Sequence, residues 1–152
     1  MRHFDLCVIG AGTGNSLIDK QLAHWDTALV DDGERFGGTC LNHGCIPTKM
    51  FVAPADHLRA RDDAARLNVT LDGVVDWPGV RDRVFGRIDP LSEGGEAWRR
   101  RNAHVTLFRR TAWFTGPRRL AVGDEEVTAD RFVITAGSRP RRPDLPGCDH
   151  PT

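Results

Sequence analysis

The sequence has no excess of either charge. Its 152 residues include 21 Lys plus Arg and 21 Asp plus Glu, which leaves a formal net charge of zero. Because the charges cancel, no long-range field would gather nucleic acid or an anionic membrane surface around the protein. The composition therefore predicts that neither nucleic acid nor a membrane is among its partners.

Long apolar runs are also absent. No stretch approaches the roughly 20 apolar residues that span a bilayer. The run near the N-terminus is short and interrupted by Asp5, which argues against a signal peptide. We therefore expect a cytoplasmic location, where ordinary cysteines stay reduced. A motif that holds two of the four cysteines then indicates redox chemistry or metal binding before a structural disulfide.

The pattern of strands and helices predicts one α/β domain. Residues 4–9 read as a buried strand, followed by a glycine turn, a helix over 15–25 and a second strand over 27–30. Five short strand-like runs within 105–135 predict an antiparallel meander that leads back to one buried strand. The expected fold is therefore a parallel sheet with an antiparallel β-meander.

Two longer helices are expected between these strands. The first starts at Pro47, is kinked at Pro54 and runs to about Leu67. The second covers 79–88, where apolar residues recur every four positions, and stops at Pro90.

Three glycines fall where the first strand ends, in "IGAGTGN": Gly10, Gly12 and Gly14. Such a turn lets backbone N–H groups approach a pyrophosphate at a helix N-terminus. The third glycine of the G-x-G-x-x-G pattern is replaced by Asn15, so the spacing alone also fits an ordinary glycine-rich turn. Asp31 follows the second strand 21 residues after Gly10, close to the roughly 20 at which a carboxylate reaches a ribose hydroxyl. Together these features predict a dinucleotide site, with Asp31 preferred to Asp32 as the ribose ligand.

Two cysteines lie five positions apart in "FGGTCLNHGCIPTK", Cys40 and Cys45. In a regular helix that spacing separates them by about 7.5 Å along the axis, and a disulfide needs Cα atoms within about 7 Å. The pair can therefore form a disulfide only if the backbone between them is irregular, which Gly44 and Pro47 favour. We expect the regular helix to start at Pro47, with Cys45 just ahead of it.

That helix start is expected to stabilise a thiolate on Cys45, and Lys49, one turn further on, adds a positive charge. Cys40 would lie on the more exposed side, suited to attack an incoming disulfide. Zinc bound by Cys40, His43 and Cys45 is the alternative, but the spacing is not C-x-x-C and a fourth ligand is hard to find, so no metal is expected. His43 is expected to face solvent. The remaining cysteines are interpreted as a core residue, Cys7, and an incidental thiol, Cys148.

The cysteine motif behind a G-x-G-x-G turn resembles the flavin-dependent pyridine nucleotide–disulfide oxidoreductases. The stretch "VITAGSRP", residues 133–140, is similar to the segment that returns to the flavin in that family. The resemblance implies a Rossmann-like FAD-binding domain, and electron flow from NADPH through FAD and the cysteine pair to a low-molecular-weight disulfide. Stretches such as "VFGRIDPLSEGGEAWRR" are most similar to the members that reduce the disulfide of mycothiol. Members that act on lipoamide or mercuric ion remain alternatives, as does a non-catalytic nucleotide-binding module.

The resemblance also implies roles for single residues. Cys45 would face the flavin and form its charge-transfer complex, Cys40 would be the interchange thiol, and Lys49 would lie near the reactive edge of the flavin ring. The implied FAD contacts are Gly10, Gly12, Thr13, Gly14, Asp31, Asp32, Gly38, Thr39, Cys45, Lys49, Ala112, Ala136, Gly137 and Ser138.

The resemblance covers only the front part of a family member. Residues 1–142 would be the first segment of the FAD-binding domain, and residues 143–152 a connector towards an NADPH-binding domain outside this chain. A family enzyme is a homodimer whose interface domain supplies a His–Glu pair to the partner's site. We therefore expect that this chain alone cannot complete turnover and that it leaves apolar surface open.

Overall fold

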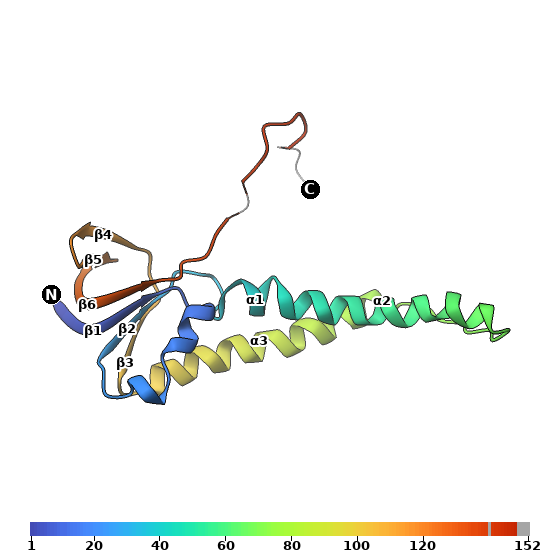
Figure 1. Cartoon of the computed structure of the whole chain (residues 1–152), viewed down its shortest axis with the longest axis horizontal. Helices are drawn as coiled ribbons and strands as arrows, with labels where there is room; N and C mark the ends of the chain where they lie inside the picture. The colour runs from blue at the N-terminus through green and yellow to red at the C-terminus, as the bar shows by residue number, and fades with distance from the viewer. Residues whose placement is uncertain (140, 149–152) are drawn as a thin grey trace.

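The structure is a computed structural model that describes residues 1–139 and 141–148. One mixed sheet holds six strands in the order β3-β2-β1-β6-β5-β4. Two long helices pack against each other and run side by side away from one end of the sheet (Figure 1). The molecule therefore has a sheet region and a projecting helical region.

Parallel pairing joins four strands: β3 (Val105–Phe108), β2 (Thr27–Val30), β1 (Arg2–Ile9) and β6 (Glu125–Ile134). Antiparallel pairing then extends the sheet from β6 through β5 (Arg119–Val122) to β4 (Ala112–Gly116). This confirms the α/β class with a parallel sheet and a meander. Two details differ from the prediction. The run at 105–108 belongs to the parallel part, and the last two predicted runs form one strand because they pair with β1 in a single register.

Strand β1 lies inside the sheet and is buried on both faces. Phe4 and Cys7 join one apolar cluster, and Leu6 and Val8 join the other. A strand covered on both faces reads as a nearly continuous apolar run, which explains why its sequence is recognisable. Burial raises the pKa of the Cys7 thiol to about 12, so Cys7 stays protonated and packs as a small core residue, as expected.

The helix predicted over 15–25 is wrong. Two short 3-10 helices replace it, η1 (Thr13–Leu17) and η2 (Lys20–Leu22). The Asp19 carboxylate accepts a hydrogen bond from the Gln21 N–H at 2.8 Å, a local contact that competes with a continuous helix. Three apolar residues of this segment still pack in or against the core, Ile18, Leu22 and Trp25, whereas Leu17 is exposed.

The cysteine motif folds into two helices, α1 (Gly38–Asn42) and α2 (Cys45–Arg66). Helix α2 starts two residues before the predicted Pro47, so Cys45 is its first residue and does not precede it. Pro47 fits there because N–H groups in the first turn have no partner within the helix. The short α1 was not predicted.

Prolines lie inside both long helices. Helix α2 continues through Pro54, and the Met50 carbonyl four residues earlier accepts a hydrogen bond from Arg83 Nη2 at 3.4 Å. Helix α3 (Trp77–Arg101) continues through Pro90, so the predicted stop is wrong. Pro90 removes one backbone hydrogen bond, but buried side chains recur along one face on both sides of it and hold the helix in place. They are Val84, Ile88, Ser92 and Arg99.

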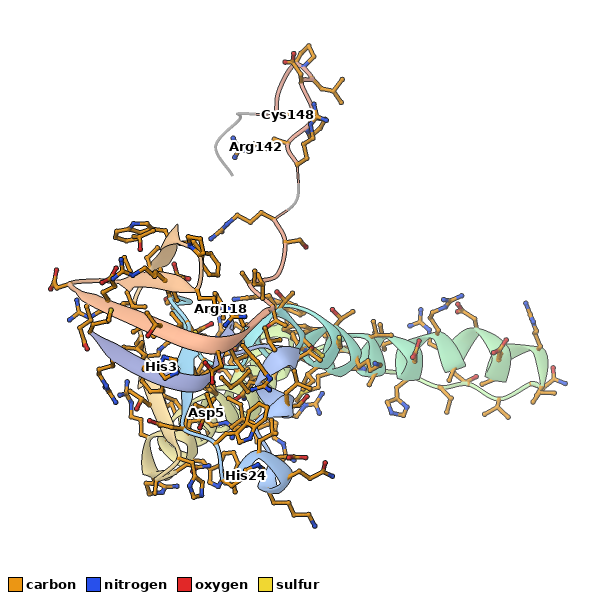
Figure 2. The ribbon with its side chains drawn as sticks, turned by 60° about the vertical axis from the view of Figure 1, so that its left-hand side comes forward. His3, Asp5, His24, Arg118, Arg142 and Cys148 are labelled. Atoms are coloured by element: carbon orange, nitrogen blue, oxygen red, sulfur yellow. The ribbon has the colours of Figure 1, made fainter. Side chains whose placement is uncertain are left out.

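The segment after β6 contains no helix or strand over residues 135–139 and 141–148. Arg142 and Cys148 lie away from the sheet in this segment (Figure 2). The predicted connector lies partly outside the described residues, and its boundary with the 1–142 domain stays a prediction. Within the described ranges, no helix is both long and apolar enough to cross a membrane.

Candidate active site

A cleft of about 690 Å³ opens at the carboxyl ends of β1, β2 and β6. Ligands of open α/β sheets bind at this edge. Three loops and the two cysteine-bearing helices contribute to its walls. The lining residues are Gly10, Ala11, Gly12, Thr13, Gly14, Ser16, Leu17, Asp31, Gly38, Thr39, Cys40, Gly44, Cys45, Thr135, Ala136 and Gly137.

The glycines of the cleft are required by close backbone contacts. Gly10 has φ +108°, and a Cβ there would lie 2.2 Å from the Thr135 carbonyl oxygen. A Cβ on Gly14 would lie 2.1 Å from Thr135 Oγ1. A Cβ on Gly38, which has φ +69°, would lie 2.5 Å from the Gly12 Cα. The loop after β1 therefore touches both the loop after β6 and the start of α1.

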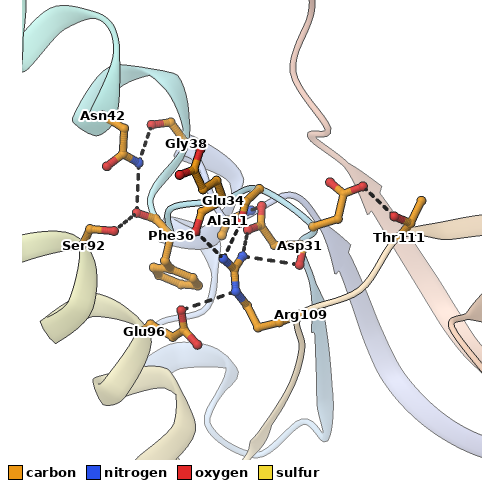
Figure 3. A network of polar contacts seen from close by, with 12 residues as sticks. Ala11, Asp31, Glu34, Phe36, Gly38, Asn42, Ser92, Glu96, Arg109 and Thr111 are labelled. Carbon is orange, nitrogen blue, oxygen red and sulfur yellow. Dashed lines mark hydrogen bonds and ion pairs between the residues drawn. The ribbon is translucent and has the colours of Figure 1, made fainter. Parts of the chain in front are cut away.

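Asp31 is held firmly at the end of β2. One carboxylate oxygen accepts a hydrogen bond from the Ala11 N–H at 3.0 Å, and the other pairs with Arg109 (Figure 3). Arg109 also lies 3.3 Å from a Glu96 carboxylate oxygen through Nε. The Asp31 side chain is only 13% exposed, yet each carboxylate oxygen keeps a second lone pair for another donor.

A smaller cavity of about 140 Å³ adjoins the cleft and shares Gly10, Asp31 and Ala136 with it. Asp32 and Ala112 line this second cavity. The Asp32 carboxylate accepts a hydrogen bond from Thr111 Oγ1 at 3.0 Å. Lys49 and Ser138, by contrast, line neither cavity.

Polar side chains of α1 and α3 hold the loop before the first cysteine. The Phe36 carbonyl accepts hydrogen bonds from Ser92 Oγ at 2.7 Å and from Asn42 Nδ2 at 3.0 Å (Figure 3). Asn42 Nδ2 also donates to the Gly38 carbonyl at 3.1 Å. The loop is thus fixed from two sides, and Gly38 at its end lines the cleft.

These supporting residues were not predicted from the sequence. Ser92 and Glu96 lie on the part of α3 beyond Pro90, where the predicted helix had stopped, and Arg109 follows β3 with no motif around it. One signal was available, because the four-residue recurrence of Val84 and Ile88 continues to Ser92.

Cys40 and Cys45 line the same cleft from neighbouring helix ends, and both are exposed free thiols. The helix is interrupted between them, as predicted. A Cβ on Gly44 would lie 3.0 Å from the Thr39 carbonyl oxygen and 3.5 Å from the Cys40 Cα. The absence of a side chain at Gly44 therefore lets α1 and α2 meet closely.

The two thiols interact electrostatically. A hydrogen bond with the Cys45 thiol raises the pKa of Cys40, and desolvation and the charge of Cys45 add to the rise. A hydrogen bond from the Cys45 backbone and the nearby Lys49 charge oppose it. The thiolate on Cys45 stays a prediction. His43 is exposed, as expected. Among residues 1–139 and 141–148, no three His, Cys, Asp or Glu side chains gather in a group that could hold a metal ion.

Comparison with protein families gives a match over residues 4–152 to a family described as pyridine nucleotide-disulphide oxidoreductase. Among curated proteins, the mycothione reductase of Mycobacterium tuberculosis is 43% identical over 150 residues, which cover 92% of this chain and 32% of that protein. The dihydrolipoyl dehydrogenase of Haloferax volcanii is 33% identical and covers 95% of this chain and 32% of that protein. The glutathione reductase of Burkholderia cepacia is 30% identical, with 96% and 33% covered.

Among solved structures, the HOCl-induced flavoprotein disulfide reductase RclA from Escherichia coli, determined as a Cu(II) complex, superimposes with a TM-score of 0.76. The match covers 93% of this chain and 30% of that one at 23% identity, so it shows a shared fold. The chain spans about a third of the length of the curated relatives it matches.

Proposed function

We propose that this chain supplies the FAD site and the cysteine pair of an NADPH-dependent reductase of small-molecule disulfides. The chain belongs to the pyridine nucleotide-disulphide oxidoreductase family. The observation that carries this proposal is that Cys40 and Cys45 line one cleft together with the glycine loop and Asp31. One bound molecule can therefore contact both the glycine loop with Asp31 and the two thiols.

The residues of the cleft fit FAD. A Cβ would collide with Thr135 at Gly10 and Gly14, and at Gly12 it would meet the Gly38 Cα at 3.6 Å. The bare backbone at these three positions suits the close approach of a pyrophosphate. Asp31 has free lone pairs for ribose hydroxyls. When bound, FAD would pass two electrons from NADPH to the cysteine pair. NADPH itself would bind outside this chain.

Disulfide reduction by the pair needs two exchange steps. The Cys40 thiolate attacks one sulfur of the substrate, which forms a mixed disulfide and releases the first thiolate. The Cys45 thiolate then attacks the Cys40 sulfur, which releases the second thiolate and leaves a Cys40–Cys45 disulfide. Two protons convert the products to thiols, so the dithiol is oxidised by two electrons and one substrate disulfide is reduced. Because the pKa of Cys40 is raised, a base must take its proton, and we assign that group to a partner subunit in a homodimer.

The substrate we propose is mycothione. Its support is the 43% identity to a mycothione reductase, which exceeds the 33% and 30% to the dihydrolipoyl dehydrogenase and the glutathione reductase. A sibling reductase that acts on lipoamide or mercuric ion is the alternative. A cytoplasmic location, where NADPH and low-molecular-weight thiols occur, belongs to the same proposal.

A single-turnover experiment tests the function. The protein is reduced with dithiothreitol, freed of reductant and mixed with one equivalent of mycothione, glutathione disulfide or lipoamide. Mass spectrometry then follows formation of the Cys40–Cys45 disulfide. We expect mycothione to react fastest, Cys148→Ser to react as the unsubstituted protein, and Cys40→Ser and Cys45→Ser to form no internal disulfide. Equal rates with all three disulfides would contradict the substrate, and no disulfide with any of them would favour a non-catalytic nucleotide-binding module.

A further inference from the structure

Asn15 occupies the place of the third glycine in the G-x-G-x-x-G pattern, and its contacts explain why. Its side-chain Oδ1 accepts a hydrogen bond from Arg99 Nε at 2.6 Å, and its carbonyl oxygen accepts one from Arg99 Nη2 at 2.6 Å. Arg99 Nη1 donates to the Ile18 carbonyl at 2.7 Å. One guanidinium from α3 therefore binds three oxygens of residues 13–18, the phosphate loop.

Arg99 is a buried cation without an acidic partner in the described chain. The residue is 3% exposed, and it forms no ion pair with any carboxylate of residues 1–139 or 141–148. Its ring contact is with the neighbouring Trp98, whose centroid lies 4.3 Å from the guanidinium carbon. Burying a charge without a counter-charge is costly, and burial lowers the pKa of Arg99 accordingly. This uncompensated charge points to an anion nearby.

The phosphate loop separates Arg99 from the cleft by one layer of backbone. Gly14 and Ser16, on either side of Asn15, both line the cleft. The five-residue η1 has too few aligned peptides to act as the helix N-terminus that usually faces a pyrophosphate. A full positive charge beneath the loop can supply the missing attraction.

We propose that Arg99 is a positioning residue that acts together with Asn15. Arg99 holds the phosphate loop from the side opposite the cleft, and its charge favours a pyrophosphate in the cleft. This inference rests on the proposed FAD site and deepens it. Arg99 donates to the Asn15 and Ile18 carbonyls, and the Asn15 carbonyl also accepts the 3-10 hydrogen bond from the Ile18 N–H at 3.2 Å, so the loop keeps its shape as a 3-10 turn. Asn15 supplies the third acceptor, which a glycine could not.

Binding of ADP and adenosine, measured by calorimetry on the protein, separates positioning from mere packing. Both ligands carry the adenine and ribose expected at Asp31, but only ADP carries a pyrophosphate. Loss of a hydrogen-bonded charge weakens binding of an anion by about tenfold or more, so Arg99→Met should raise the Kd of ADP by about that factor and leave the Kd of adenosine within about twofold. Arg101→Met, on an exposed position of the same helix, is the matched control and should change neither Kd.

A cycle of variants tests the pairing with Asn15. Asn15→Ala should raise the Kd of ADP by several-fold, and adding it to Arg99→Met should raise the Kd no further, because the amide acts through the guanidinium. Arg99→Lys, which keeps the charge without the planar fork, should recover part of the lost affinity. If Arg99→Met fails to fold, Asn15→Ala and Arg99→Lys still decide the matter.

Parallel losses of ADP and adenosine binding, or additive effects of the two substitutions, would overturn the inference and leave the proposed FAD site intact. If the unsubstituted protein binds neither ligand, both the inference and the FAD site fail. Neither result would affect the cysteine exchange measured in the absence of nucleotide, so the two proposals can fail separately.

Discussion

The two ends of helix α3 have opposite surroundings. Beyond Val84 the helix lies under the cleft and buries Ile88, Ser92 and Arg99. Before Val84 it joins the outer part of α2 in a helical arm, residues 51–80, which projects from the sheet (Figures 1 and 2). Large apolar side chains are exposed along the arm and its connecting loop: Val52, Leu67, Val69, Leu71, Val74, Val75 and Trp77.

The two regions differ in how many side-chain contacts within the chain hold them in place. At the cleft end, Ser92, Glu96 and Arg99 of α3 reach the segments that follow β2, β3 and β1. In the arm, the aromatic contacts are limited to Phe51, stacked on Trp77 at 5.3 Å and edge-on to Phe85 at 6.2 Å. The cleft is therefore expected to carry the free energy of folding, and the arm to contribute little. The exposed apolar surface of the arm agrees with the expectation from the sequence.

The largest contrast is expected between two glycines. Gly10→Ala forces a Cβ against the Thr135 carbonyl at an unfavourable φ and should cost more than about 3 kcal/mol. Gly86 lies on an exposed stretch of α3, where an added Cβ would meet no atom within 4 Å, so Gly86→Ala should stabilise the helix by about 0.5–1 kcal/mol. Urea unfolding measures both. Similar midpoints for the two variants would contradict the contrast.

A second contrast concerns apolar packing. Ile88 is fully buried and Val74 is 97% exposed. Ile88→Ala should lower the free energy of unfolding by about 2–5 kcal/mol, whereas Val74→Ala should change it by less than about 0.5 kcal/mol. Thermal melts at two protein concentrations check this. A concentration-dependent loss for Val74→Ala would show that another copy of the chain covers the arm, and the two regions would then no longer differ in this way.

The smallest effect is expected on the pH dependence of Cys40 alkylation, at the start of α2, where the two regions join. The Cys45 thiol is the main cause of the raised pKa of Cys40, and Lys49 lowers it. Cys45→Ala should therefore shift the pH dependence of Cys40 alkylation by iodoacetamide to lower pH, and Lys49→Gln should shift it slightly to higher pH. Alkylation of Cys40 is followed by mass spectrometry over about pH 7–10, which brackets the ordinary range of a thiol. Shifts of the opposite sign would show that the two groups do not interact as in the structure.

The features that could be predicted are local in sequence. Strand β1 is recognisable because burial on both faces restricts its residue types directly. Gly10 is required by its positive φ, and Gly14 by its close contact with Thr135. The interruption between Cys40 and Cys45 falls at Gly44, where a Cβ would lie 3.0 Å from the Thr39 carbonyl oxygen. The helix predicted over 15–25 failed because the Asp19 carboxylate caps a separate turn and because Arg99, more than eighty positions away, donates to the Asn15 and Ile18 carbonyls. The stop predicted at Pro90 failed because burial of Ser92 and Arg99 outweighs one lost hydrogen bond.

Residue types along the chain are enough to specify the fold class, the nucleotide turn and the place of the cysteine pair, because each depends on positions within about one turn or one strand. The support of the cleft, by contrast, is set by tertiary contacts alone. The Ser92–Phe36 and Arg99–Asn15 contacts join residues 56 and 84 positions apart. The spacing of Ser92 marks it as buried, but nothing in the chain names its partner, because a buried polar group can be satisfied by any donor or acceptor that the fold brings close.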